Sequence, residues 1–324
     1  MSSLVDSFEL DSVEMRQAYC DALIEEAKRN PKLFVVDVDV SHSVGTGRFY
    51  QAFPDRALNC GIMEAHAIGM CAGMSETGMV PFFHAFGPFA TRRVFDQIFI
   101  SCAYQDLNVK IIGADPGVTA QTNGGTHMPF EDLGLMRLIP NVTIVEPADS
   151  TMYSYVVRAM AEKYGVFYLR TSRRKTVKLY KPGTEFEIGK AVKLYDGKDV
   201  CLIGCGIMVY EAVRARDILR KEGIDAAVLD MHTIKPLDEK SVLEAAEKCG
   251  AIVTAENHNR VGGLGSAVAE LITEKYPVPV ERVGVDESFG EVGTQQYLQQ
   301  RFGLTGEEIA RKAKIAIQRK GAKK

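Results

Sequence analysis

The sequence lacks the features of disulfide-rich, zinc-ribbon and membrane-spanning proteins. It has no CxxC pair, and its seven cysteines are odd in number and scattered, so neither a disulfide framework nor a zinc ribbon is indicated. This cysteine usage fits a reducing cytoplasm. A run of about 18 apolar residues, which a membrane helix needs, is also missing. Residues 77–91, one of the longest stretches without charge, are interrupted by glycine and proline.

The sequence also lacks a strong charge of either sign. The formal net charge of −3 gives no global field that would attract nucleic acid or an acidic membrane, so we expect neither as a partner. The basic residues within 311–324 are expected to be solvated at the end of a helix. Residues 1–14 contain four acidic residues and no basic n-region, so we expect no signal or transit peptide.

The length and the local patterns predict two α/β domains. The 324 residues correspond to about two units of roughly 150 residues. Short β-branched runs alternate with helical patterns along the whole chain, which is typical of βαβ units around a parallel sheet. The strand candidates are residues 33–40, 80–86, 109–115, 142–146, 166–171, 199–204, 225–231, 251–256 and 280–285.

The alternation pauses once, near the middle of the chain. After residue 170 the sequence becomes basic and then loop-like through Pro182 and Gly183, and the alternation restarts at Asp199. We therefore predict two doubly wound domains, residues 1–185 and 186–324. In open α/β sheets ligands bind beyond the carboxyl ends of strands, so the segments that follow the strands are the place to look for a site.

Four such segments stand out in the first half. Residues 37–43 end a hydrophobic strand in two acids and two hydroxyls, and residues 59–69 place Glu64 in or near the first turn of a helix, where an acid could simply complement the helix terminus. Residues 81–89 carry a cluster of aromatic rings, which are more often core than ligand platform. Residues 115–129 form a long polar loop rich in glycine, and such a loop on a rigid sheet predicts ligand contacts.

Together these segments resemble a known family. Gly61 to Glu64, the Phe86/Phe89 pair and Gly125-Thr126-His127, in this order and spacing, are similar to the pyrimidine-binding domain of transketolases. The second half, through residues 231–237 and 255–265, resembles the C-terminal domain shared by transketolases, deoxyxylulose-phosphate synthases and the β chains of 2-oxoacid dehydrogenases. The resemblance covers nearly the whole chain.

The resemblance also implies a missing part. Transketolases hold the diphosphate of thiamine diphosphate and its metal ion, Mg²⁺ or Ca²⁺, in a separate domain with a Gly-Asp-Gly motif, which this sequence lacks. The chain is therefore similar to the C-terminal subunit of split bacterial transketolases, and we expect no metal ligand in it. The expected partner is an N-terminal, diphosphate-binding subunit, and two copies of each chain are expected to form a heterotetramer.

The family implies a role for several residues near the cofactor. Glu64 matches the glutamate that hydrogen-bonds a nitrogen of the aminopyrimidine ring, and Phe86 and Phe89 match the aromatic wall of that ring. Asp39 lies where the family places an acid close to the cofactor. His127 corresponds to the histidine that hydrogen-bonds the hydroxyls of the donor and the developing alkoxide. The catalytic residues expected are thus Glu64 and His127.

Other positions concern the sugar. Arg16, Ser43 and Arg173 match positions that hold the phosphate of the substrate. Asn123 stands where the family has an acid, and Asp115 stands where transketolases commonly have a phosphate-contacting histidine. Because these two substitutions change the charge and hydrogen bonding offered to the sugar, we expect a specialised ketose donor and poor use of pentose phosphates.

The leading hypothesis is an enzyme subunit that transfers a two-carbon ketol unit from a ketose to an aldose. The main rival is the β subunit of a 2-oxoacid dehydrogenase, which shares both domains but acylates lipoamide. A non-catalytic scaffold subunit is the alternative of another class. The sequence assigns no catalytic role to the second half, whose glycines and histidines indicate turns and structural contacts.

Overall fold

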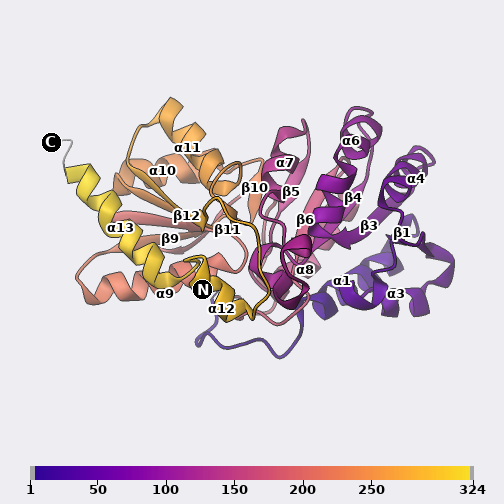
Figure 1. Cartoon of the computed structure of the whole chain (residues 1–324), viewed down its shortest axis with the longest axis horizontal. Coiled ribbons are helices and arrows are strands. Elements are labelled where there is room, and N and C mark those ends of the chain that lie inside the picture. The colour runs from indigo at the N-terminus through magenta and orange to yellow at the C-terminus, as the bar shows by residue number, and fades with distance from the viewer. Residues whose placement is uncertain (1–3, 322–324) are drawn as a thin grey trace.

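Figure 1 shows two α/β lobes side by side, in a computed structural model that describes residues 4–321. Part of the acidic N-terminal stretch and the last two lysines of the basic tail lie outside these residues. Within residues 4–321 the first lobe contains a seven-stranded sheet in the order β10-β5-β6-β4-β3-β1-β2. Six strands run parallel to one another: β1 (Leu33–Asp37), β2 (Ala57–Asn59), β3 (Val80–Phe86), β4 (Lys110–Ala114), β5 (Thr143–Val145) and β6 (Phe167–Thr171).

The second half of the chain completes the edge of the first sheet. Strand β10 (Thr233–Lys235) leaves the second lobe and pairs antiparallel with β5. The second sheet has the order β12-β11-β8-β9-β7. Its edge strand β7 (Val192–Tyr195) is antiparallel to β9, while the other pairs are parallel. The remaining strands are β8 (Val200–Gly204), β9 (Ala226–Asp230), β11 (Ile252–Asn259) and β12 (Val280–Val285).

Both faces of each sheet are buried, which is what doubly wound domains require. In the first sheet Val36 and Phe83 face α4 (Glu64–Glu76), whereas their neighbours Val35 and Phe82 face α1 (Met15–Arg29) and α8 (Tyr153–Glu162). In the second sheet α10 (Glu239–Cys249) and α11 (Leu264–Lys275) cover one face, and α9 (Met208–Lys221) and α13 (Gly306–Gly321) cover the other. The predicted fold class is confirmed.

The shorter helices connect these layers. The segment after β3 is irregular. The sequence of residues 89–104 has a helical pattern and predicts one helix there, but the structure has the short helices α5 (Gly87–Ala90) and α6 (Phe95–Gln97) and a π-helical stretch (Ile98–Ala103). The remaining α-helices are α2 (Ser41–Val44), α3 (Gly47–Ala52), α5 (Gly87–Ala90), α6 (Phe95–Gln97), α7 (Asp132–Leu138) and α12 (Gln295–Arg301).

The connection between the lobes is fixed by buried hydrogen bonds. The Asp149 carboxylate accepts from the backbone N–H groups of Thr151, Leu179 and Tyr180, and the Tyr180 hydroxyl donates to Asp230 of the second lobe over 2.6 Å. Burial raises the pKa of Asp230 to about 7. The exact division between residues 185 and 186 stays a prediction.

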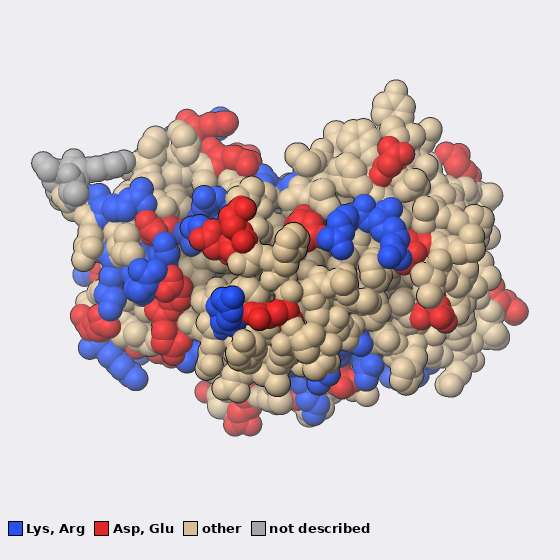
Figure 2. Space-filling view, viewed as in Figure 1, with Lys and Arg blue, Asp and Glu red and all other residues tan. Residues whose placement is uncertain are grey.

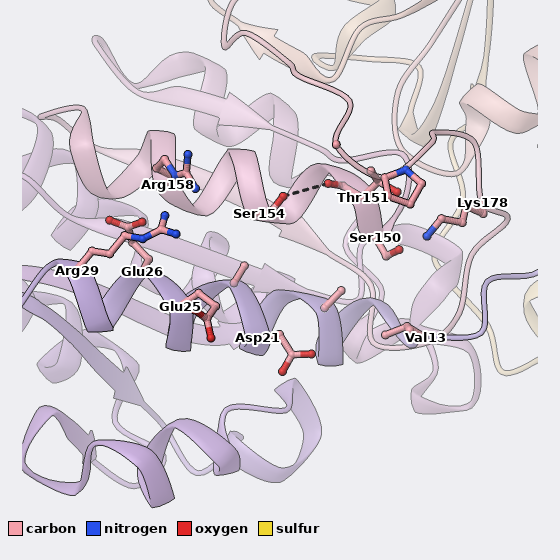
Figure 3. A pocket seen from close by; sticks show the side chains of 14 residues that line it. Val13, Asp21, Glu25, Glu26, Arg29, Ser150, Thr151, Ser154, Arg158 and Lys178 are labelled. Carbon is pink, nitrogen blue, oxygen red and sulfur yellow. Dashed lines mark hydrogen bonds between the residues drawn. The ribbon is translucent and has the colours of Figure 1, made fainter. Parts of the chain in front are cut away.

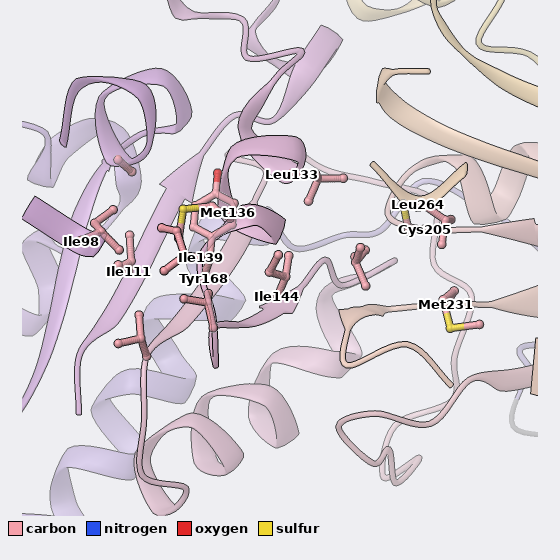
Figure 4. Close-up of a cluster of buried hydrophobic side chains, with 14 of the residues drawn as sticks. Ile98, Ile111, Leu133, Met136, Ile139, Ile144, Tyr168, Cys205, Met231 and Leu264 are labelled. Carbon is pink, nitrogen blue, oxygen red and sulfur yellow. The ribbon is translucent and has the colours of Figure 1, made fainter. Parts of the chain in front are cut away.

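A single hydrophobic cluster runs from one lobe into the other. In Figure 4, Ile98, Ile111 and Tyr168 of the first lobe lie in the same cluster as Cys205 and Leu264 of the second. Because protein interiors are close-packed, this shared core favours one relative placement of the two lobes.

Beside this cluster lies a fully buried arginine. The Arg170 guanidinium donates two hydrogen bonds to Asp132, at 2.8 and 3.0 Å, one to Glu146 at 2.8 Å, and one to the backbone carbonyl of Asn257 at 3.1 Å. The Tyr168 hydroxyl also donates to Asp132. Burial alone would raise the pKa of Asp132, but the charges of Arg170 and His258, together with the hydrogen bonds from Arg170 and Tyr168, outweigh burial and hold this pKa below its ordinary value.

The surface carries no continuous basic patch on the face drawn in Figure 2, where blue and red side chains are interspersed. Charged side chains are denser over the second lobe, at the left, than over the first. Within residues 4–321, no helix has the length and apolar character needed to cross a bilayer.

The buried network generates a prediction about stability. Replacing Arg170 by Met leaves Asp132 and Glu146 buried without their counter-charge, so we expect the free energy of unfolding to fall by roughly 3–5 kcal/mol. Chemical denaturation followed by circular dichroism measures it. The control is Arg319→Met, which removes a half-exposed partner of Glu281 and is expected to cost about 1 kcal/mol or less. An Arg170→Met variant as stable as this control would contradict the prediction.

Candidate functional site

The predicted residues gather at the carboxyl edge of the first sheet. Phe86 ends β3, Asp115 follows β4, and Arg173 follows β6. These strands are parallel neighbours, so their carboxyl ends lie together and the side chains that follow them converge.

Two phenylalanines and a histidine form an aromatic group there. The ring of His127 stands edge-on to Phe86 and to Phe89, with centroids 5.4 and 5.0 Å apart. Phe86 is buried at the end of β3, and Phe89 is half-buried in α5. The Thr126 hydroxyl lies 2.8 Å from Nδ1 of His127, which leaves Nε2 as the ring nitrogen available to a ligand.

Glu64 begins α4 and is almost completely buried. Its Oε1 accepts a hydrogen bond of 2.7 Å from Arg93, and its other carboxylate oxygen has no hydrogen bond within residues 4–321. The Arg93 guanidinium also lies over the Phe89 ring, 3.9 Å from its centroid. Arg93 therefore joins the carboxylate to the aromatic group.

Sequence reasoning missed Arg93. The signal available was the pair of arginines, Arg92 and Arg93, shortly after Phe89, which the sequence places inside a predicted helix. The irregular backbone over residues 87–103 turns only the second of them toward Glu64, while Arg92 pairs with Glu131.

Arg173 joins the other side of the aromatic group. Its guanidinium lies 5.2 Å from the centroid of Phe86, its backbone N–H and Nε donate to the buried carboxylate of Asp115, and its Nη2 donates to the side-chain oxygen of Asn123 over 3.3 Å. Burial raises the pKa of Asp115, and Arg173 opposes that shift. The Asp115 carboxylate is thus occupied by Arg173.

Arg16 and Ser43 form a second group nearby. Arg16 donates from Nη1 to the backbone carbonyls of Ser43 and His42, at 3.2 and 3.4 Å, and pairs with Glu14. Its backbone N–H donates to the carbonyl of Arg173 over 3.4 Å, which connects this group to the site.

Asp39 lies apart from these contacts. It is exposed after β1, in a left-handed conformation with φ of 64°, and its N–H donates to the side chain of Asn59. The other acid of the same segment, Asp37, is fully buried and accepts a hydrogen bond from Thr46.

A separate cavity of about 480 Å³ lies between α1 and α8 and contains none of the predicted site residues. Figure 3 shows Asp21, Glu25 and Arg29 of α1 facing Ser154 and Arg158 of α8 across it. Its lining mixes acids and bases.

The site generates a prediction about the charge of His127. Partial burial, with the positive charges of Arg173 and Arg93, lowers the pKa of His127 below its ordinary value of 6.5, so the imidazole is neutral at pH 7. Arg173→Met removes one of these charges and is expected to raise this pKa. Proton NMR titration of the histidine resonances, with His127→Gln to assign the signal, measures it. A His127 pKa above 6.5 in the unaltered chain would show that the two arginines do not govern its charge.

Two family patterns match the chain. The transketolase pyrimidine binding domain matches residues 11–178, and the transketolase C-terminal domain matches residues 189–309. A solved structure, described as a split gene transketolase in an inactive β4 tetramer, superposes with a TM-score of 0.88 at 40% identity, covering 96% of this chain and all of that one.

Several proteins with similar sequences are named as transketolases or transketolase subunits. The 6-deoxy-6-sulfo-D-fructose transketolase subunit SqwH of Clostridium sp. (strain MSTE9) is 46% identical over 94% of this chain and 95% of its own length. A subunit of the apulose-4-phosphate transketolase of Phocaeicola vulgatus is 34% identical, covering 93% and 96%. Transketolase of Homo sapiens is 32% identical over 93% of this chain but only 48% of its own length, so the chain spans about half of that protein. The resemblance found in the motifs is thereby confirmed, and the chain belongs to the transketolase family.

Proposed function

We propose that this chain is the pyrimidine-binding subunit of a thiamine-diphosphate-dependent transketolase whose diphosphate-binding subunit is a second polypeptide. The observation that carries the proposal is one continuous series of contacts: Glu64 to Arg93, Arg93 to Phe89, and Phe89 and Phe86 to His127. It unites a buried carboxylate, an aromatic wall and a neutral histidine at the edge of the sheet where ligands bind.

The residues present fit an aminopyrimidine. Glu64 keeps one carboxylate oxygen without a hydrogen-bond partner within residues 4–321, and Phe89, which Arg93 links to Glu64, offers a half-buried ring. A ring nitrogen of the pyrimidine would hydrogen-bond to the free oxygen of Glu64, and the flat face of the pyrimidine would pack on the Phe89 ring. Phe86 would extend the wall, and Asp39 would face the cofactor from the end of β1.

Thiamine diphosphate, when bound, supplies the carbon nucleophile that opens the C2–C3 bond of a ketose. The residues of this chain would bind and orient the cofactor and the donor for that reaction. Glu64 would fix the protonation of the pyrimidine through its ring nitrogen. A neutral His127 with its proton on Nε2 would donate a hydrogen bond to the donor oxygen as negative charge develops there.

The proposed role of Glu64 predicts the effect of one substitution. Glu64→Gln keeps the shape but removes the carboxylate, so we expect ketol transfer by the reconstituted pair to fall by about 100-fold or more while thiamine diphosphate still binds. Glu76→Gln, at the exposed end of the same helix, is the control and should keep full activity. Full activity of Glu64→Gln would instead favour the scaffold interpretation, and pyruvate-dependent acylation of lipoamide would favour the dehydrogenase.

The donor is proposed to be a ketose with an anionic group at its far end. Arg173, Arg16 and Ser43 would recognise that group, and Asn123 would contact a hydroxyl. Asp115 would act by holding Arg173, because its carboxylate is already engaged. Relatives named for a sulfofructose and for apulose 4-phosphate support such a specialised donor.

The loop predicts a preference among donors. We expect the reconstituted pair to turn over xylulose 5-phosphate with a kcat/KM about 10- to 100-fold below that for its preferred ketose, 6-deoxy-6-sulfofructose being the first to try. Asn123→Asp, which provides an acid but spares Asp115 and its bond to Arg173, should raise kcat/KM for xylulose 5-phosphate. Gln121→Glu, in the same loop, is the control. Efficient use of xylulose 5-phosphate with ribose 5-phosphate by the unaltered pair would contradict the preference.

The partner and the assembly complete the proposal. The partner would hold the diphosphate and its Mg²⁺ or Ca²⁺, and two copies of each chain would form a heterotetramer. Exposed apolar side chains support an interface close to the site: Ile62 and Met63, which are 71% and 55% exposed, directly precede Glu64. We expect this chain alone to be inactive and the co-purified pair to sediment at the mass of two copies of each; an active 1:1 heterodimer would refute the tetramer.

A further inference from the structure

The loop that carries Asn123 and His127 belongs by packing to the second domain. Val118, Met128 and Phe130 are buried in one hydrophobic cluster with Val285 and Leu298 of that domain. Phe130 also meets Phe302 edge-on, with ring centroids 5.4 Å apart. The apolar side chains of the loop are therefore anchored away from the sheet that precedes it.

Asn257, at the end of β11, binds the base of this loop. Its side-chain oxygen accepts from the N–H of Val118 over 2.9 Å, and its side-chain nitrogen donates to the carbonyl of Pro116 over 2.8 Å. Gly117 lies between the two bonds with a φ of +50°, and a Cβ there would collide with the amide of Asn257. Asn257 is fully buried, so neither bond is exchanged for water.

Two further contacts hold the rest of the loop. The N–H of Asn259 donates to the carbonyl of Phe130 over 2.9 Å, which fixes the end of the loop. At its middle, Gly125 packs so closely on the carbonyl of Gly290 that a Cβ at Gly125 would collide with it. The base, the middle and the end are thus each in contact with the second domain.

We propose that Asn257 is a positioning residue for ketol transfer. It fixes the turn at residues 116–118, and through that turn it places His127 against Phe86 and Phe89 and keeps Asn123 within reach of Arg173. This inference rests on the proposed function and extends it: the second domain, to which the sequence assigns no catalytic role, shapes the donor site from behind.

The chemistry of the position favours an amide. The turn offers one N–H and one carbonyl to the same side chain, so the side chain must accept and donate at once, as an asparagine amide does. A carboxylate at this position would keep the bond from Val118 but would set an acceptor against the carbonyl of Pro116. Leucine, of similar size, would leave both backbone groups buried without partners.

The test compares Asn257→Leu and Asn257→Asp in the complex reconstituted with the diphosphate-binding subunit. A misplacement of about 1 Å at a reacting group costs on the order of 100-fold in rate, so we expect kcat/KM for the donor ketose to fall by about 100-fold with leucine and less with aspartate. The affinity for thiamine diphosphate should stay within about twofold, because Glu64, Phe86 and Phe89 lie on α4, β3 and α5. A merely structural loss would lower both.

Val242→Ala provides a control of matched destabilisation. Val242 is fully buried in α10, on the other face of the second sheet from the loop cluster. It should lower the unfolding temperature but leave the KM for the donor unchanged. The proposal is overturned if Asn257→Leu, folded and loaded with thiamine diphosphate, keeps the kcat/KM of the unaltered complex.

Hydrogen exchange on this chain alone separates the inference from the proposed function. In Asn257→Leu the backbone amides of residues 117–130 should exchange more than about 10-fold faster, while those of β1, β3 and β4 keep their rates. Unchanged exchange in residues 117–130 would show that Asn257 does not fix the loop, and would overturn the inference even if the complex proves to be a transketolase. A complex without ketol transfer on any ketose would defeat the proposed function even where the exchange result holds.

Discussion

Arg170 carries a positive charge where water cannot reach it, and the arrangement of both lobes depends on its partners. Its guanidinium meets Asp132 at the start of α7, Glu146 after β5, and the backbone carbonyl of Asn257 in the second lobe. Such a buried charge tolerates little displacement, because each lost hydrogen bond leaves an unpaired group in a low dielectric. The hydrogen bonds of Arg170 therefore fix the position of the end of β11 relative to β6 more precisely than hydrophobic packing alone would. The side chain of the same Asn257 holds the base of the loop over residues 115–129, so the contacts that place the two lobes also place this loop.

This constraint explains why a long polar loop can be ordered. A segment with glycines at 117, 124 and 125 and a left-handed residue at Gln121 loses much conformational entropy when it takes one conformation. Its apolar side chains offset that cost by burial in the core of the second lobe, and its glycines allow the close approaches that this burial needs. Two polar residues of the loop, Asn123 and His127, are not buried in that core and face the first lobe. The loop is therefore stabilised by contacts with the second domain, while its polar side chains face the first domain.

The sequence predicts the regular part of this molecule well and the irregular part poorly. Residues 80–86 and 280–285 appear as strands with the predicted bounds: every residue of the first is buried, and in the second the buried residues are Val283 and Val285. Strands β2, β7 and β10 were missed: each is three or four residues long and lies at a sheet edge, where pairing rather than local pattern decides the conformation. In the site, the motif pointed to Glu64, the phenylalanines, His127 and Arg173, which the structure brings together. Arg93 and Asn257 were not found, since the first depends on an irregular backbone and the second on a contact between residues 139 positions apart.

The electrostatics of the site follow from two ion pairs of similar design. Arg93 pairs with Glu64 and lies over Phe89, while Arg173 pairs with Asp115 and lies beside Phe86. Each arginine thus neutralises a buried acid and also borders one ring of the aromatic group, and His127 stands between the two rings. Partial burial and both positive charges oppose protonation of His127, so its pKa is lowered and the ring stays neutral. A neutral imidazole can donate from one nitrogen while the other is held by Thr126. The paired arginines therefore do more than balance charge: they also keep His127 neutral, which is the form that the proposed role of this histidine requires.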